Sequence, residues 1–340
     1  MLNRRTFLFA GGLAQALPGA VSPIRIAFLG AYHSHAIGKL QVVKHSPDWQ
    51  LVGFWDDNEI GRRSFLAQGV PELSLEAILE DPSIQAVAVE SDVALHATHA
   101  LRALNAGKHL HLEKPPAATL AEFAHLQDVA RTRKRFLQMG YMWRYSPALV
   151  CAEEVVAQGW LGKIHSVRAT INTLIDCSRR PEWARFRGGQ MFEQGSHAID
   201  LVVRAMGRPH KVTSYLRKDG QCDDTLADNT VAVFEWPGCL GLITASTLQP
   251  NAIPYRAVEF LGTNGTLVVR PAEGASVRLD LVVAAGPYRA GIQEIETKPF
   301  KRYVGDFADL ARSIRQGTPL RVAAQADLDV HETLMRACTM

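Results

Sequence analysis

The feature of this 340-residue chain that most constrains its fold is an alternation of short apolar segments with helix-like segments, from Ile24 to Leu112. Apolar runs typical of buried strands occupy residues 24–29, 51–55, 86–90 and 109–112. Segments with helical spacing lie between them, at 34–45, 60–68, 75–79 and 94–105. Strands that alternate with helices form right-handed crossovers and a parallel sheet. The sequence therefore predicts an α/β fold that begins with a doubly wound, Rossmann-type sheet, which binds nucleotides at the carboxyl ends of its strands.

The second half of the chain has a different pattern, in which strand-like segments are separated mainly by turn sequences. These segments are 164–171, 211–217, 230–236, 241–248, 257–261 and 277–283. They predict an α+β domain with a mostly antiparallel open sheet, covered on one side by a helix that contains His197. Helices at 304–316 and from 324 onward close the chain. With 47% hydrophobic residues the chain is long enough for two domains, which we place at 23–141 and 142–340.

The first 22 residues have the pattern of a targeting segment. Paired arginines, Arg4 and Arg5, precede an apolar run from Phe7 to Val21 that glycines and a proline interrupt, so it is too short to span a membrane. The segment resembles a twin-arginine export signal, which predicts a periplasmic or exported protein with no membrane association after export. The alternative is an N-terminal tail with two incidental arginines, in which case the protein stays in the cytoplasm.

Charge and cysteine content exclude several classes of function. The formal net charge is +3, and no run of basic residues contains interleaved aromatics, so we expect no nucleic-acid partner. Five scattered cysteines without a C-x-x-C pair argue against a disulfide framework and a structural zinc site. We also expect no metal at the two His-x-His pairs, His33/His35 and His109/His111, because alternate residues of a strand point to opposite faces.

The loop after the first strand is an incomplete dinucleotide-binding sequence. The pattern places glycine at the first, third and sixth positions, and only Gly30 complies, since Tyr32 and His35 take the other two places. We predict a weak but usable phosphate loop in which Ser34 caps the following helix. The predicted cofactor contacts of this loop are Gly30, Tyr32, His33, Ser34 and His35.

Acidic residues after the second strand add to the evidence for a dinucleotide. Asp56 lies at the distance from the loop where a carboxylate accepts hydrogen bonds from the adenosine ribose. Because the adjacent Asp57 repels a 2′-phosphate, we predict NAD rather than NADP. The alternative interpretation of Asp56 is a turn or helix-capping aspartate.

Residues 188–200 concentrate groups suited to acid–base chemistry. Glu193, His197 and Asp200 are spaced i, i+4 and i+7, which places them on one face of a helix. A histidine in such a row exchanges a proton near neutral pH. The alternative is a core histidine that packing alone retains.

Three segments together resemble one family in its order and approximate spacing. They are Gly-Lys-His leading into Glu113-Lys114-Pro115, then Arg144-Tyr145-Ser146-Pro147, and then the Gly188-Gly189 to His197-Ala198-Ile199-Asp200 stretch. The resemblance is to the Gfo/Idh/MocA family, which includes glucose-fructose oxidoreductase and inositol dehydrogenase. It covers nearly all the chain after residue 22.

This resemblance implies roles for particular residues. Lys114 would lie between the nicotinamide and the substrate, with Glu113 beside the cofactor, and His197 would handle the substrate hydroxyl proton. Glu193 stands where the family commonly has aspartate, and we expect it to orient or tune His197. The family's Thr-Pro-Asn turn is replaced by residues 90–93, Glu-Ser-Asp-Val. The resemblance also implies a homo-oligomer that forms through the open sheet.

A basic and aromatic stretch at residues 179–187 lies between the predicted domains. Its side chains stack on sugar rings and bind hydroxyl or carboxylate groups, although a solvated basic loop is an equal alternative. The substrate contacts we predict are Arg144, Trp183, Arg185 and Asp200.

These observations lead to one main hypothesis and two alternatives. The main hypothesis is an NAD-dependent oxidoreductase that acts on a secondary alcohol of a sugar, sugar acid or cyclitol, with Lys114, His197 and Glu193 as catalytic residues. The first alternative is a glycoside hydrolase that uses bound NAD for a transient oxidation. The second is a non-catalytic nucleotide- or sugar-binding protein, suggested by the atypical phosphate loop.

Overall fold

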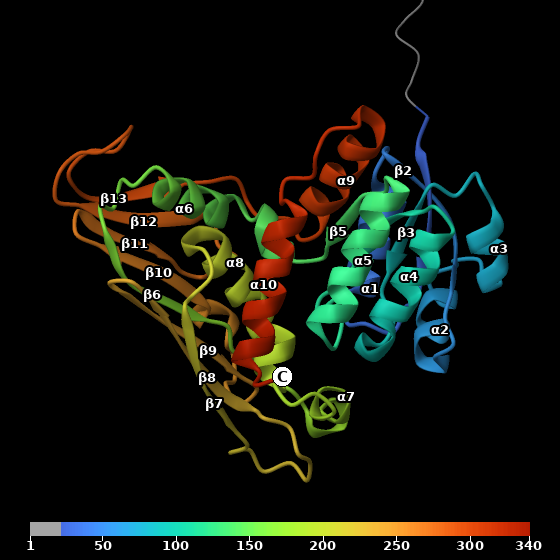
Figure 1. The fold of residues 1–340 in the computed structure, drawn as a ribbon, viewed down its shortest axis with the longest axis horizontal. Coiled ribbons are helices and arrows are strands. Elements are labelled where there is room, and N and C mark those ends of the chain that lie inside the picture. Colours follow the sequence, from blue (N-terminus) through green and yellow to red (C-terminus); the bar gives the residue numbers. More distant parts are fainter. Residues whose placement is uncertain (1–21) are drawn as a thin grey trace, which may run out of the picture.

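The computed structural model describes residues 22–340 and begins with a five-stranded parallel sheet (Figure 1). The predicted signal segment, residues 1–22, lies outside the described residues except for Ser22. The strand order is β2-β1-β3-β4-β5, as the alternating pattern predicts for a doubly wound sheet. The strands are β1 (Ile24–Leu29), β2 (Trp49–Trp55), β3 (Ala86–Val89), β4 (His109–Leu112) and β5 (Leu137–Met139).

Five helices accompany these strands: α1 (Ala36–His45), α2 (Glu59–Leu66), α3 (Leu75–Glu80), α4 (His96–Asn105) and α5 (Leu120–Arg133). The sequence pattern did not identify α5 or β5, although α5 begins with a capping box in which Thr119 and Glu122 bind each other's backbone amides. Because the strand order reverses between β1 and β3, the loops after these two strands diverge. A crevice at their carboxyl ends follows from this reversal.

The second domain contains an eight-stranded sheet in the order β13-β12-β11-β10-β6-β9-β8-β7. All neighbouring strands are antiparallel except β6 and β9. This confirms the predicted mostly antiparallel sheet. The strands are β6 (Ile164–Thr170), β7 (Lys211–Arg217), β8 (Asn229–Trp236), β9 (Cys239–Ser246), β10 (Ala257–Gly262), β11 (Gly265–Val269), β12 (Ser276–Leu281) and β13 (Gly291–Glu296).

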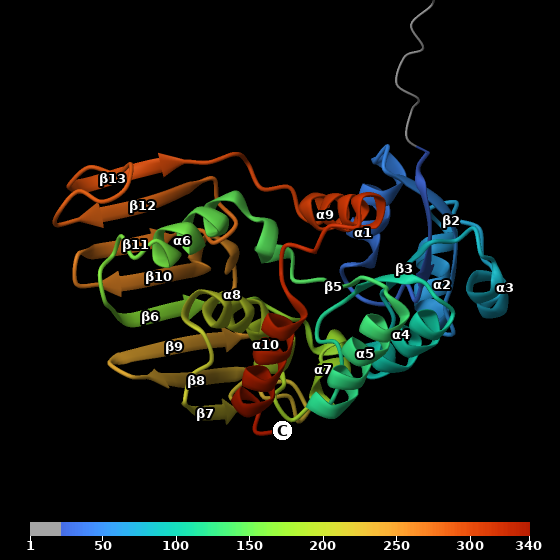
Figure 2. The ribbon, with the colours of Figure 1, turned by 45° about the horizontal axis from the view of Figure 1, so that its top comes forward.

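Helices cover one face of this sheet, and the last helix of the chain also packs on the first domain (Figure 2). The helices of this half are α6 (Pro147–Ala157), α7 (Pro181–Ala184), α8 (Ser196–Met206), α9 (Val304–Gln316) and α10 (Ala324–Ala337). Helix α9 packs on the first domain, where Phe307 stacks on His111 with ring centroids 4.7 Å apart and contacts Trp49. Helix α9 follows the boundary at residue 141 in the sequence but packs on the first sheet, so this boundary does not assign α9 to the domain that it contacts.

One prediction about the cysteines is wrong, because Cys177 and Cys222 form a disulfide with Cα atoms 5.5 Å apart. The bond links the segment before α7 to the loop between β7 and β8. Next to it, Arg180 forms ion pairs of 2.5 Å with Asp224 and 2.6 Å with Asp228. Cysteines 45 residues apart meet because the sheet brings the β7–β8 loop under the α7 segment.

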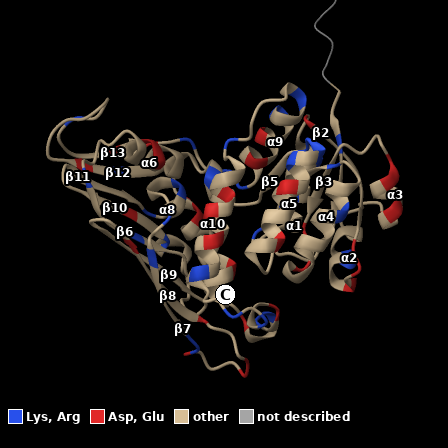
Figure 3. Ribbon diagram, in the orientation of Figure 1, with Lys and Arg blue, Asp and Glu red and all other residues tan. Residues whose placement is uncertain are grey.

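Acidic and basic residues are interspersed along the ribbon of both domains, in agreement with the near-balanced charge of the sequence (Figure 3). Within residues 22–340, every helix is too short or too polar to cross a bilayer.

Candidate active site

The loop after β1 has the backbone of a phosphate loop despite its side chains. Gly30 has φ +85°, and a Cβ atom there would lie 2.3 Å from the backbone of Ser91, so this position requires glycine. Within residues 22–340, the backbone amides of Tyr32 and Ser34 have no acceptor. The predicted capping role of Ser34 is wrong: the N-cap of α1 is His35, without a side-chain cap. The first turn of α1 thus faces the crevice with backbone donors available for an anion.

Asp56 follows β2 beside this loop, as predicted, and is 3% exposed. One carboxylate oxygen accepts the Ala31 amide at 2.7 Å, and the other accepts the Asn58 amide at 2.9 Å. Burial raises the pKa of Asp56, although these two hydrogen bonds oppose the shift. Asp56 therefore shapes the phosphate loop, which is the alternative interpretation of the sequence, and its contact with a ribose stays a prediction.

A buried ion network lies directly behind the loop. The Lys39 ammonium of α1 binds Glu90 at 2.6 Å and also contacts Glu113. Burial lowers the pKa of Lys39, but the two carboxylates outweigh burial and raise it overall. The Glu113 carboxylate is fully buried and held by Lys39 and His35, and its predicted contact with the cofactor stays a prediction. Sequence reasoning missed Lys39, although a lysine on the apolar face of a helix is a signal of a buried partner.

The histidines of the loop lie closer together than the sequence predicted. His33 and His35 have ring centroids 4.7 Å apart and share Glu113 as a neighbour, so these three residues offer ligand atoms within 4.8 Å of one another. The argument from strand alternation fails because both histidines belong to a turn. A metal ion bound here would share the Glu113 carboxylate with the Lys39 ammonium. The repulsion between these two positive charges disfavours metal binding.

Lys114, Glu193 and His197 converge at the junction of the domains. The fully buried Lys114 ammonium contacts the Glu193 carboxylate and lies 3.4 Å from the Glu193 carbonyl oxygen. It also lies 6.0 Å from the ring centre of Trp183. Glu193 therefore binds Lys114 and not His197, which differs from the predicted partnership between Glu193 and the histidine. We call Lys114, Glu193 and His197 the junction cluster.

The predicted single helical row is interrupted in its first part. Met191–Gly195 forms a π-helical turn, and α8 begins only at Ser196. This wider turn changes the direction of Glu193 relative to His197, as π-bulges at functional sites commonly do. The i, i+4 spacing therefore brings the two residues to one cavity without a hydrogen bond between them.

His197 is buried with its ring near aromatic groups of both domains. Its centroid lies 6.0 Å from those of His35 and Trp143, and 5.9 Å from that of Tyr141. Its Nδ1 has no hydrogen-bond partner within residues 22–340. Burial, together with the Lys114 ammonium, holds the pKa of His197 well below its ordinary value. The imidazole is therefore neutral at neutral pH and able to accept a proton.

Two predicted substrate contacts lie elsewhere. Arg144 binds Asp200 at 2.6 Å and Asp327 at 2.5 Å, and all three side chains are buried in the second domain. None of them lines the cavities at the domain junction. Arg144 and Asp200 form a buried ion pair with each other, so their predicted substrate role is corrected to a structural one. We call Arg144, Asp200 and Asp327 the sealed cluster.

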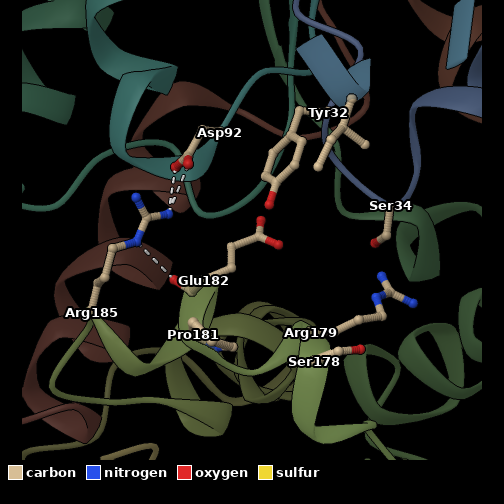
Figure 4. A pocket seen from close by; sticks show the side chains of 9 residues that line it. Tyr32, Ser34, Asp92, Ser178, Arg179, Pro181, Glu182 and Arg185 are labelled. Carbon is tan, nitrogen blue, oxygen red and sulfur yellow. Dashed lines mark hydrogen bonds and ion pairs between the residues drawn. The ribbon is translucent and has the colours of Figure 1, made fainter. Parts of the chain in front are cut away.

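The phosphate loop and the α7 segment enclose a cleft of about 520 Å³. In Figure 4, Glu182 points toward the hydroxyl of Tyr32, and Arg179 points toward Ser34. Arg185 closes one end by an ion pair of 2.7 Å with Asp92, at the carboxyl end of β3. Thus Arg185 lies at the cleft as predicted, and the structure binds it to an acidic residue of the opposite domain.

Two smaller cavities continue from this cleft toward His197. One of about 300 Å³ is lined by Trp183 and Arg179, and the other, of about 140 Å³, by His35 and His197. These two cavities share Ser34, Glu193 and Gln194, and the larger of them shares Ser34 and Arg179 with the cleft, so the three cavities lie in a row from the phosphate loop to the imidazole. A path of this kind accommodates a dinucleotide and a small second ligand end to end.

Comparison with known proteins identifies the family. Residues 24–141 match the model of an oxidoreductase family with an NAD-binding Rossmann fold, and residues 150–268 match the GFO/IDH/MocA C-terminal domain. The chain belongs to the Gfo/Idh/MocA family of NAD(P)-dependent oxidoreductases. The resemblance seen in its three sequence motifs is therefore confirmed, as are the doubly wound fold and the NAD-binding domain.

Several relatives are dehydrogenases of hydroxylated rings. The scyllo-inositol 2-dehydrogenase (NADP+) IolW of Bacillus subtilis is 30% identical over 281 residues, which are 75% of this chain and 76% of that enzyme. A 1-carboxy-3-chloro-3,4-dihydroxycyclohexa-1,5-diene dehydrogenase of Comamonas testosteroni is 30% identical over 176 residues, 49% of this chain and 44% of that enzyme. The chain spans about half the length of the first curated relatives it matches.

Solved structures share the whole fold. GenD2 from gentamicin A biosynthesis, in complex with NAD, is 24% identical with a TM-score of 0.77, and the match covers 96% of each chain. The WlbA dehydrogenase of Bordetella pertussis, in complex with NADH and UDP-GlcNAcA, is 19% identical with a TM-score of 0.77 and covers 95% of this chain and 97% of that one. At these identities the likeness establishes the architecture.

Proposed function

We propose that this protein is an NAD-dependent dehydrogenase that oxidises a secondary alcohol on a sugar, sugar acid or cyclitol. The observation that carries the proposal is the meeting of Lys114, Glu193 and His197 beside one path of cavities that starts at the phosphate loop. Acid–base groups beside a dinucleotide crevice are what oxidation of an alcohol requires.

The residues of the crevice fit a dinucleotide. Gly30 allows close approach, and the unpaired amides of Tyr32 and Ser34 provide donors for a pyrophosphate. When bound, nicotinamide supplies the hydride acceptor for the reaction. Beyond β2, Asp57 is exposed, while Arg62 already binds Glu72 at 2.7 Å and Arg63 binds Glu59 at 2.8 Å. The two arginines at this edge are already paired, and the exposed Asp57 carboxylate would repel a 2′-phosphate. The edge therefore favours NAD over NADP.

The neutral imidazole of His197 accepts the proton of the substrate hydroxyl as the carbon–hydrogen bond of the same carbinol breaks. Lys114 donates a hydrogen bond to the substrate oxygen and so stabilises the negative charge that develops on it. Glu193 lines the two smaller cavities, and its ion pair holds the Lys114 ammonium directly behind them. Glu193 is therefore a positioning residue for Lys114 in this mechanism.

The names of the relatives support the substrate class. Besides the inositol and dihydroxycyclohexadiene dehydrogenases, a levoglucosan dehydrogenase of Pseudarthrobacter phenanthrenivorans is 28% identical over 71% of this chain. These names share a hydroxyl group on a ring carbon, and one of the named rings carries a carboxyl group. We therefore place the substrate of this chain among cyclic polyols and their acids.

Export and self-association are part of the proposal. The Cys177–Cys222 disulfide is typical of proteins that leave the reducing cytoplasm, which supports the twin-arginine interpretation of the N-terminus. On the second sheet, large apolar side chains are exposed on three strands: Tyr215 of β7, Leu240 and Leu242 of β9, and Ile292 of β13. Exposed apolar residues along a sheet favour a second copy of the chain as a partner.

Purified full-length protein tests the function directly. Calorimetric titration with NAD and NADP should show tighter binding of NAD, and a panel of sugars, sugar acids and cyclitols should yield NADH with at least one member. The proposal fails if neither cofactor binds. Products without net NADH from aryl glycosides would instead support the transient-oxidation alternative.

A further inference from the structure

Two guanidinium groups border the small cavity beside His197. Arg256 lies immediately before β10, and Arg302 lies two residues before α9, so the far wall of this cavity comes from the second sheet and the chain that leaves it. His35, Glu193 and His197 form the wall on the side of the domain junction. A ligand in this cavity of about 140 Å³ therefore touches the proposed proton acceptor and the two arginines together.

One carboxylate serves both arginines. Arg256 donates through Nη1 to Glu273 Oε1 at 3.2 Å and through Nε to the Asn172 carbonyl oxygen at 3.0 Å. Arg302 donates through Nε to Glu273 Oε2 at 2.6 Å. Within residues 22–340, neither Nη2 of Arg256 nor Nη1 of Arg302 has an acceptor.

Arg256, Arg302 and Glu273 together thus carry one net positive charge. Arg256 is 7% exposed, and burying a cation without a full set of partners is costly. The Lys114–Glu193 pair adds no net charge, because each group balances the other. An anionic group bound in the cavity would neutralise the wall and supply the missing acceptors.

We propose that Arg256 and Arg302 bind a carboxylate of the substrate and hold a ring carbinol of the same molecule against His197. This inference rests on the proposed function and narrows its substrate class to hydroxy acids of sugars or cyclitols. A carboxylate matches the single excess charge and the planar fork of a guanidinium group. A phosphate ester carries about twice that charge near neutral pH and is the competing anion for the test.

The experiment compares hexuronates with their uncharged parents. With NAD and full-length protein, kcat/KM should be about 10- to 100-fold higher for D-glucuronate or D-galacturonate than for D-glucose or D-galactose, the range expected for a charge-assisted contact. Arg256→Gln and Arg302→Gln should each remove most of this preference, mainly by raising KM for the acids. Hexose 6-phosphates form a third set of substrates.

A matched control and a second variant keep the result clear. Arg270→Gln removes a guanidinium that lies over Tyr255, 5.3 Å from its ring centre, and it should leave the preference for the acids unchanged. Arg302 is 41% exposed, so Arg302→Gln should fold even if Arg256→Gln does not. The inference is overturned if neutral sugars, cyclitols or hexose phosphates are oxidised as efficiently as the acids. Failure of NAD to bind, or of every member of the panel to react, refutes the proposed function itself.

Discussion

The junction cluster and the sealed cluster are two buried groups of side chains, and each takes part of its members from residues 188–200. Glu193 and His197 belong to the first, and Asp200, three residues further along α8, belongs to the second. Both clusters pair a cation with carboxylates and exclude solvent. They differ in what lies beside them: Glu193 and His197 line cavities that lead to the phosphate loop, whereas Arg144, Asp200 and Asp327 line none of these cavities. Both clusters are therefore buried and charged, and they differ in whether a ligand can reach them.

The largest expected difference between the clusters is in turnover. His197→Ala removes the proton acceptor, and Lys114→Ala removes the donor to the substrate oxygen. Each should lower kcat by about 10²- to 10⁴-fold, the range of general acid–base catalysis. Steady-state kinetics on a substrate identified from the panel measures the change. Parental turnover in both variants would remove the junction cluster from the mechanism.

The sealed cluster should instead respond in stability. Arg144→Met leaves Asp327 buried without its cation and Asp200 with only Arg204, which lies 3.1 Å away. Breaking a buried ion pair in this way costs about 3 to 5 kcal/mol of unfolding free energy. Urea unfolding measures that loss, and turnover per folded molecule should stay near the parental value. A variant of normal stability with much lower turnover would restore the predicted substrate role of Arg144.

These two clusters also show how far the sequence could lead. The alternating pattern predicted the first sheet, and short motifs led to Lys114 and His197, because strand ends and helical spacing are local properties. Arg144 and Asp200 belong to equally clear motifs, but Asp327, the second partner of Arg144, is far along the chain. Spacing within one segment cannot show which face a distant helix covers. For that reason a structural pair was predicted as a substrate site.

The same limit explains what the sequence missed. Lys39 pairs with Glu90 and Glu113, from strands that meet α1 only in three dimensions. Arg256 and Arg302 lie outside any motif, and their nearness to His197 depends on how the second sheet faces the first domain. The Cys177–Cys222 pairing likewise follows from the fold of the β7–β8 loop.

A smaller effect is expected at the disulfide, which ties the α7 wall of the cleft to the second domain. Replacing Cys177 and Cys222 by serine frees a loop of 45 residues, and bonds of this kind contribute about 2 to 4 kcal/mol. Because Trp183 and Arg185 belong to this wall, KM should rise while kcat changes little. Thermal unfolding and kinetics of the double variant measure both effects, with Cys151→Ser as the control. Unchanged stability after reduction would show that Arg180 and its aspartates hold the wall without the bond.

The smallest expected effect separates the clusters by the sign of their pH dependence. Burial raises the pKa of Asp327 to about 6, despite Arg144, whereas an aspartate in the unfolded chain has a pKa of about 3.9. Between these values the folded protein holds a proton that the unfolded chain releases. The contribution of Asp327 to the unfolding free energy therefore falls, by on the order of 1 to 3 kcal/mol, as the pH rises from about 4 to 6.

His197 should show the opposite slope. Its pKa in the folded protein lies well below the ordinary value, so below about pH 6.5 the unfolded chain binds a proton that the folded protein does not. The contribution of His197 to the unfolding free energy therefore rises with pH up to about 6.5. Relative to the parent, Asp327→Asn should gain stability and His197→Gln should lose stability as the pH rises from about 4.5 to 6.5 in urea unfolding. If the unfolding free energies of all three proteins change in parallel with pH, neither group has a different pKa in the folded and unfolded states. Water would then reach both clusters. A shared slope of one sign would mean that the two clusters have the same electrostatic environment and that the cavities alone distinguish them.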